Sequence, residues 1–219
     1  MKSRNSGWKV RPLAQDHTVV YKSPDPETVY CYTPGICVCP DGRLIATIDL
    51  GGPGVEEMSG EKFIRPVGFG KAYKGKIFTS DDRGKTWECR ADFAFMHARP
   101  FKAGGSLYVI GQAMDVTIIR SDDWGKTWSS PVRLTEDGRS WGQSACNVHF
   151  ANGCVYLTME VHKYWPEKHV GESECAVILM RAKIEDDLTD PSSWTFSDGL
   201  TREDTFELDQ LDYHGIPFF

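Results

Sequence analysis

A nine-residue segment that occurs twice constrains the fold of this 219-residue chain more than any other feature. The first copy, residues 79–87, reads TSDDRGKTW, and the second, residues 120–128, reads RSDDWGKTW. The serines of the two copies, Ser80 and Ser121, are 41 residues apart. A repeat of this period predicts an array of similar supersecondary units, and roughly 40–50 residues make one four-stranded blade of a β-propeller.

Each copy has the residue types of a tight turn between two strands. Asp side chains accept hydrogen bonds from the backbone N–H groups of a turn, and Gly adopts a positive φ without steric cost. The Thr-Trp pair that ends each copy then begins a new strand. We therefore expect two β-hairpins, each with its Trp packed between neighbouring sheets.

Both copies resemble the Asp-box, S-x-D-x-G-x-T-W, of the sialidase-like (BNR repeat) propellers. Either member of each Asp pair could be the motif Asp. In this family the box is structural and lies on the face away from the active site, and the resemblance implies the same role here. The matching residues are Ser80, Asp82, Gly84, Thr86, Trp87, Ser121, Asp123, Gly125, Thr127 and Trp128.

Composition supports an all-β protein and argues against several classes of partner. The chain has 21 Gly, 12 Pro and 7 Trp, which is typical of many short strands joined by turns. Its net charge is −6 and no basic run is present, so a nucleic-acid-binding surface is not expected. No apolar run approaches the roughly 18 residues that a membrane-spanning helix needs. Residues 1–7 contain no apolar segment, so no secretory signal is visible and a cytoplasmic location is the default.

Seven cysteines predict neither a disulfide framework nor a zinc site. Their number is odd and no C-x-x-C pair occurs, so we expect small packed thiols in a reducing compartment. We expect no metal and no cofactor.

The pattern of strands and turns divides the chain into a short N-terminal extension, residues 1–17, and an incomplete β-propeller domain, residues 18–219. A lone strand at 18–21 precedes blades at about 30–93, 98–134 and 145–196, and 212–217 begins a fourth. Within the first blade, a long loop that contains Gly and Glu is expected from 51 to about 75. The third blade has a degenerate box at 187–194. Propellers of this family have six blades, so the chain is expected to be the N-terminal part of a longer protein. Closure by self-association and an open stack are the alternatives.

Topology indicates which end of the array carries function. In an up-and-down blade the hairpin joining the first two strands and the hairpin joining the last two lie at the same end. The repeated segments are hairpins of the second kind, so ligands are expected at the opposite end, on loops held by a rigid scaffold. The candidate substrate-binding residues at that end are Tyr32, Arg65, His97, Arg99, Gln112, Arg139, Trp141, His162, Tyr164 and His214.

Two carboxylates at the same end are the catalytic candidates. Asp49 ends the second strand of the first blade, and Glu160 ends the second strand of the third. A carboxylate at the end of an inner strand is costly to bury without a partner. We therefore expect Glu160 to be either functional or paired with Arg99 or Arg139.

Family sialidases are retaining glycoside hydrolases with a Tyr nucleophile, an Asp acid/base and three Arg residues that bind the sugar carboxylate. The resemblance implies a carbohydrate ligand and makes Asp49 the candidate acid/base. The first family Arg lies in an R-I-P motif, whereas this chain has Tyr32-Thr33-Pro34 there. Two hypotheses follow: an exo-acting sialidase-like glycosidase or a fragment of one, and a carbohydrate-binding propeller without catalysis. A protein-interaction scaffold is a third class, because the fold alone does not choose among them.

Overall fold

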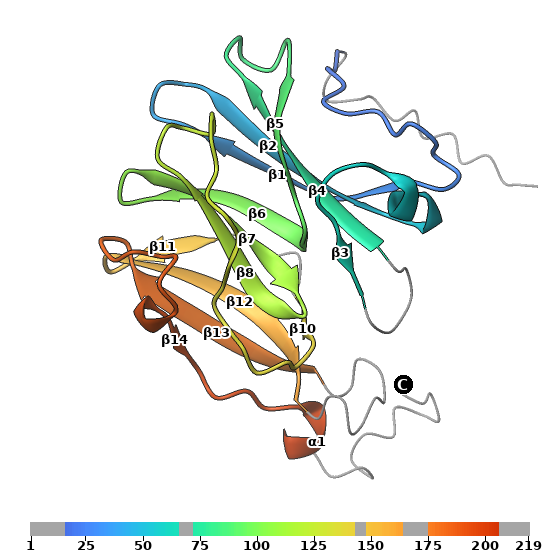
Figure 1. Ribbon diagram of the computed structural model, residues 1–219. Helices are drawn as coiled ribbons and strands as arrows, with labels where there is room; N and C mark the ends of the chain where they lie inside the picture. Colours follow the sequence, from blue (N-terminus) through green and yellow to red (C-terminus); the bar gives the residue numbers. More distant parts are fainter. Residues whose placement is uncertain (1–15, 66–71, 143–147, 164–174, 206–219) are drawn as a thin grey trace, which may run out of the picture.

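The computed structural model describes residues 16–65, 72–142, 148–163 and 175–205. In these residues the chain forms three antiparallel β-sheets, which succeed one another along the sequence and lie side by side in a fan (Figure 1). The prediction of an all-β fold is confirmed.

The first sheet contains the first copy of the repeat. Its main strands pair in sequence order, and β3 is added alongside the beginning of β4. A 3₁₀ helix, η1 (Pro53–Glu57), follows β2. The strands are β1 (Tyr30–Val38), β2 (Leu44–Gly51), β3 (Phe63–Ile64), β4 (Ala72–Ser80) and β5 (Glu88–Phe93).

The second and third sheets repeat this up-and-down pairing. The second consists of β6 (Met96–Ala103), β7 (Ser106–Ala113), β8 (Asp115–Ser121) and β9 (Val132–Arg133). In the third, β10 and β11 both pair with β12, at its two ends, and β13 pairs with β14. Its elements are β10 (Trp141–Gly142), β11 (His149–Ala151), β12 (Cys154–His162), β13 (Cys175–Lys183), the 3₁₀ helix η3 (Pro191–Ser193), β14 (Thr195–Phe196) and the helical turn α1 (Arg202–Thr205).

The strand predicted at residues 18–21 is wrong. These residues form no strand. Instead, the ring of Tyr21 lies 5.9 Å from that of Phe78 on the outer side of the first sheet, so this segment covers an apolar face without pairing with a strand. The loop expected at 51–75 also contains more structure than its Gly and Glu residues indicated, namely η1, β3 and the first residues of β4. The expected start of a fourth blade at 212–217 lies outside the described residues.

Two apolar layers hold the three sheets together. Between the first and second sheets, Ile45 and Ile77 pack with Leu107 and Val109. A larger cluster, which includes Ile118 from the second sheet and Met159 and Met180 from the third, fills the next layer. These side chains recur at every second position along their strands, as expected where one face of a sheet is buried.

The repeated segments form the two tight turns between β4 and β5 and after β8. In the second copy, Asp123 accepts hydrogen bonds from the backbone N–H and the hydroxyl of Thr127, at 2.9 and 2.7 Å, and from the hydroxyl of Ser121 at 2.9 Å. Asp82 makes the equivalent bonds to Thr86 and Ser80. The second Asp of each pair therefore organises the turn.

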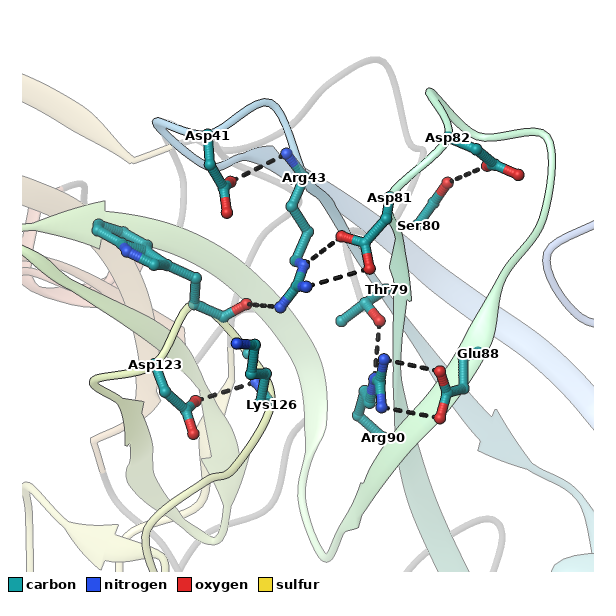
Figure 2. Close-up of polar contacts among 12 residues, drawn as sticks. Asp41, Arg43, Thr79, Ser80, Asp81, Asp82, Glu88, Arg90, Asp123 and Lys126 are labelled. Atoms are coloured by element: carbon teal, nitrogen blue, oxygen red, sulfur yellow. Dashed lines mark hydrogen bonds and ion pairs between the residues drawn. The ribbon is translucent and has the colours of Figure 1, made fainter.

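The first Asp of each pair has a different task. Asp81 accepts hydrogen bonds from Nε and Nη2 of Arg43, at 2.5 and 3.1 Å (Figure 2). Arg43 lies at the end of the β1–β2 turn, directly before β2. Asp122 in the second copy likewise accepts from the hydroxyl of Ser106, the first residue of β7. Nη1 of Arg43 also donates to the carbonyl of Trp124, 3.3 Å away. In each of the first two sheets, these bonds therefore connect the hairpin between the first two main strands with the turn that follows the third. Both turns lie at the same end of the sheets, as the topology predicted.

No helix in the described part of the chain is long and apolar enough to cross a membrane.

Candidate functional site

The other end of the sheets is shaped by two irregularities in the innermost strands. The register of β1 on β2 shifts between Tyr32 and Gly35, and that of β6 on β7 shifts between Met96 and Arg99. Thr33 and His97, within these bulges, have positive φ angles of 42° and 55°. Bulges of this kind re-aim side chains and occur often beside functional sites.

Asp49 lies between the two bulges. Its side chain is completely buried, and its two oxygens accept from the N–H of Ala98 at 3.5 and 3.3 Å. Burial raises its pKa to about 7, while hydrogen bonds from the His97 and Ala98 backbone and from Thr33 act in the opposite direction. The candidate acid/base thus faces the backbone of both bulges, and our expectation that it would meet a ligand directly does not fit this geometry.

A cleft of about 260 Å³ opens next to the second bulge. The ends of β6, β7, β10 and β12 form its walls, so it joins the second and third sheets at the end away from the Asp turns. Its lining residues are Phe63, Arg65, Met96, His97, Gln112, Met114, Ser140, Trp141, Gly142, Glu160, His162 and Cys175.

Glu160 provides the carboxylate of the cleft. It is half-buried and pairs in register with Gly142 of β10. Among the described residues, none forms a hydrogen bond or ion pair with its carboxylate. The predicted alternative of pairing with Arg139 is not seen, because Arg139 binds Asp137 instead, with Nη2 and Oδ2 2.6 Å apart.

His97 and Gln112 form a polar pair in the same cleft. Nδ1 of His97 and Nε2 of Gln112 are 2.6 Å apart. Burial lowers the pKa of His97, and the nearby Arg99 guanidinium lowers it further, so the imidazole is neutral at neutral pH. Gln112 is 95% buried and its Oε1 has no hydrogen-bond partner in the described structure. Whichever way the amide is turned, one polar atom of Gln112 is left without a partner.

A thiol–imidazole pair also lines the cleft. Sγ of Cys175 is 3.7 Å from both ring nitrogens of His162, and the two residues are partners in the β12–β13 register. Within the described ranges, no group of three or more His, Cys, Asp and Glu side chains is arranged to hold a metal ion.

Six of the predicted site residues line the cleft: Arg65, His97, Gln112, Trp141, Glu160 and His162. Others point elsewhere. Arg99 lines a separate hollow between β1 and β6, with Ile36 and Phe150, and Tyr32 is 42% exposed on β1 and lines neither hollow. Arg139 lines a neighbouring groove, and Tyr164 and His214 lie outside the described residues.

The sequence reasoning missed Phe63, Met96, Met114 and Cys175. Phe63 belongs to β3, in a segment that was read as loop, and its pairing with Tyr73 in β4 brings it to the cleft. Cys175 was interpreted as a packed thiol. Its position at the start of β13, directly opposite His162, was the available signal.

No protein-family model matches the sequence, and no curated protein matches it. Solved structures do share its fold. An α-L-arabinofuranosidase from Lactobacillus brevis superposes with a TM-score of 0.53 at 16% identity, over 80% of this chain and 57% of that one. The catalytic domain of a GH62 α-L-arabinofuranosidase from Coprinopsis cinerea gives 0.50 at 10% identity, over 84% of this chain and 54% of that one. A Hadza microbial sialidase gives 0.49 at 15% identity, over 77% and 37%.

The chain therefore shares part of the propeller-like fold of these structures, and it spans a little over half the length of the first two.

Proposed function

We propose that this chain binds the terminal sugar of a glycoside in the cleft between the second and third sheets and forms part of a glycoside hydrolase. One observation carries this: an unpaired carboxylate, a neutral imidazole and an orphaned amide line one small hollow at the end opposite the structural turns. Sugar hydroxyls both donate and accept, so they can satisfy all three groups at once.

Glu160 is the residue that we propose to contact the reacting sugar. Its carboxylate would accept a hydrogen bond from a sugar hydroxyl, or act as a general acid or base in the cleavage of the glycosidic bond. Asp49 does not contact the sugar in this proposal. It is a positioning residue, because its carboxylate accepts from the Ala98 N–H and so holds the bulge at His97. Hydrolysis by the two-carboxylate mechanism needs two acids about 5–10 Å apart. A second acid, or a nucleophilic tyrosine of the sialidase type, would come from beyond the described residues.

The sialidase-like alternative within this proposal requires an acidic sugar. Arg65 is the cleft's guanidinium, and no described residue pairs with it, so it could bind a sugar carboxylate. The presence of Tyr32 where an Arg is expected weakens this alternative.

A panel of fluorogenic glycosides, including an α-L-arabinofuranoside and an α-sialoside, tests the proposal. Turnover or competitive binding of one of them is expected, with Glu160→Gln reducing turnover at least about a hundredfold. Glu185→Gln, an exposed Glu in the turn after β13, is the matched control and should leave turnover unchanged. A Glu160→Gln variant as active as the control would remove Glu160 from the mechanism.

A carbohydrate-binding protein without catalysis is the second candidate. The observation that favours it is that Glu160 is the one acidic side chain lining the cleft in the described part of the chain. Saturable binding of a glycan on an array, with the same glycan recovered intact after long incubation, would decide in its favour.

A further inference from the structure

A second hollow, which we call the Trp141 groove, lies next to the cleft. Its volume is about 730 Å³, and it is formed by the segment before β10, the ends of β12 and β13, and the segment after β14. Trp141 lines both the groove and the cleft, so the two hollows adjoin at this residue.

The indole of Trp141 is held in place by its neighbours. Trp141 is 6% exposed, and its Nε1 donates to Oδ1 of Asp137 at 2.8 Å. The guanidinium carbon of Arg139 lies 5.7 Å from the indole centre, and Arg139 is itself held by Asp137. The indole is therefore fixed on one side by a hydrogen bond and a cation–π contact.

Phe196 adds a second, more exposed aromatic ring beside Trp141. Its ring centre is 5.9 Å from that of Trp141, and the residue is 38% exposed. Leu200, 64% exposed, lies in the same groove. A two-χ aromatic ring presented on a fixed support costs little entropy to order, so it is suited to stacking on the apolar face of a sugar ring.

The charges of the groove disfavour an anionic ligand. Its two cations are engaged, Arg139 with Asp137 and Lys163 with Asp204. Its two remaining carboxylates, Glu136 and Asp198, are exposed and form no hydrogen bond with another described residue. Carboxylates accept hydrogen bonds from hydroxyl groups but repel an anionic ligand.

We propose that the Trp141 groove binds the continuation of a neutral oligosaccharide whose end lies in the cleft, with Phe196 as the stacking platform. This rests on the proposed function, and it adds that the ligand is an uncharged chain of several sugars. Binding should therefore strengthen as the chain becomes longer.

Calorimetric titration with two series, L-arabinose to α-1,5-arabinotetraose and D-xylose to xylotetraose, tests this. For at least one series, the affinity of the wild-type chain should rise by roughly three- to tenfold per added sugar in the groove. Phe196→Ala should remove that gain while leaving monosaccharide affinity unchanged, and Phe196→Tyr should retain it. Phe150→Ala, a 45% exposed Phe on β11 that does not line the groove, is the matched control.

The outcomes separate the two proposals. If monosaccharides bind and longer chains bind no better, or if Phe196→Ala keeps the gain while its melting curve matches the control, the groove assignment is overturned and the cleft stands. If no member of either series binds, the groove assignment is overturned. The proposal that the cleft binds the terminal unit of these neutral sugars is then overturned as well.

Discussion

The carboxylate of Asp49 and the backbone N–H of Ala98 join the first and second sheets across 49 positions of sequence, with Oδ2 3.3 Å from the nitrogen. The bond holds the β6 bulge in which His97 adopts a positive φ and reaches the cleft. A wholly buried acid thus sets the position of a residue at the candidate site.

The stability contributed by Asp49 should depend on pH. Its folded pKa of about 7 is above the ordinary 3.8, so the folded state binds a proton that the unfolded state has lost. That contribution is present in full below about pH 4 and is lost as the pH rises through 7, by at most about 4 kcal/mol. Urea unfolding at pH 4.5, 6 and 8 should show wild-type stability falling relative to Asp49→Asn across this range.

Asp16→Asn, at an exposed carboxylate outside the strands, is the control and should run parallel to wild type. A constant difference between Asp49→Asn and wild type at all three pH values would refute the prediction.

The second Asp of the repeated turn should matter for stability through its acceptor oxygens. Asp123→Ala removes the bonds to Ser121, Lys126 and Thr127 and should lower the free energy of unfolding by about 1–2 kcal/mol. Although desolvation acts the other way, the Thr127 bonds hold the pKa of Asp123 at about 2. The contribution is therefore present above pH 4 and is lost as the pH falls toward 2.

Asp123→Asn keeps one acceptor oxygen and should cost less than Asp123→Ala in thermal unfolding at pH 7. Equal losses for the two variants would contradict this prediction, because they would mean that the one acceptor oxygen kept by Asn contributes nothing to the turn.

Asp92 neutralises two lysines, one of them fully buried. Nζ of Lys74, whose side chain is 1% exposed, is 2.6 Å from Oδ2 of Asp92, and Nζ of Lys76 is 2.8 Å from Oδ1. Asp92→Asn leaves a buried ammonium without its counter-ion and should cost roughly 2–4 kcal/mol. Lys76→Met, which removes the more exposed lysine, should cost under about 1 kcal/mol by chemical denaturation. The reverse order would contradict this reading of the cluster.

Gly75 is required by close packing on Phe93. The two residues are register partners in β4 and β5, and a Cβ at Gly75 would fall within the Phe93 ring. Gly75→Ala should therefore destabilise the first sheet by about 2–4 kcal/mol, because Phe93 also packs at 4.3 Å on Phe95 and has no room to move. In the Phe93→Leu background the same change should cost much less, and a purely additive double mutant would disprove a direct clash.

The residue at position 112 should influence the pKa of the His97 imidazole. Replacing Gln112 with Glu puts a carboxylate within hydrogen-bond reach of Nδ1 and should raise the pKa of His97, which burial and Arg99 now lower. NMR titration of the His97 ring protons measures this, with His149 on exposed β11 as an internal reference. An unchanged His97 pKa would show that the pair is not in contact in solution.

Much of the architecture could be read from local sequence. The turn chemistry of the Asp pairs is contained within nine residues, and the pattern of strands and turns placed the blades at about 30–93, 98–134 and 145–196. The division of labour between Asp81 and Asp82 could not be read, because it depends on Arg43, which is 38 positions away in sequence. The segment 18–21 was mistaken for a strand because a β-prone sequence carries no information about whether a partner edge is free.

The candidate site, too, could be predicted from the sequence only in part. Sequence order alone placed Arg65, His97, Gln112, Trp141, Glu160 and His162 at one end of the sheets, since alternating strand direction is fixed by the hairpins. It could not separate Asp49, buried under two bulges, from Glu160, open to the cleft, because burial depends on how neighbouring sheets pack. The sequence by itself determined the strands, the turns and the end at which polar residues gather. The tertiary structure alone decided which of those residues share a hollow, because register shifts of one or two residues redirect side chains in ways that no local pattern records.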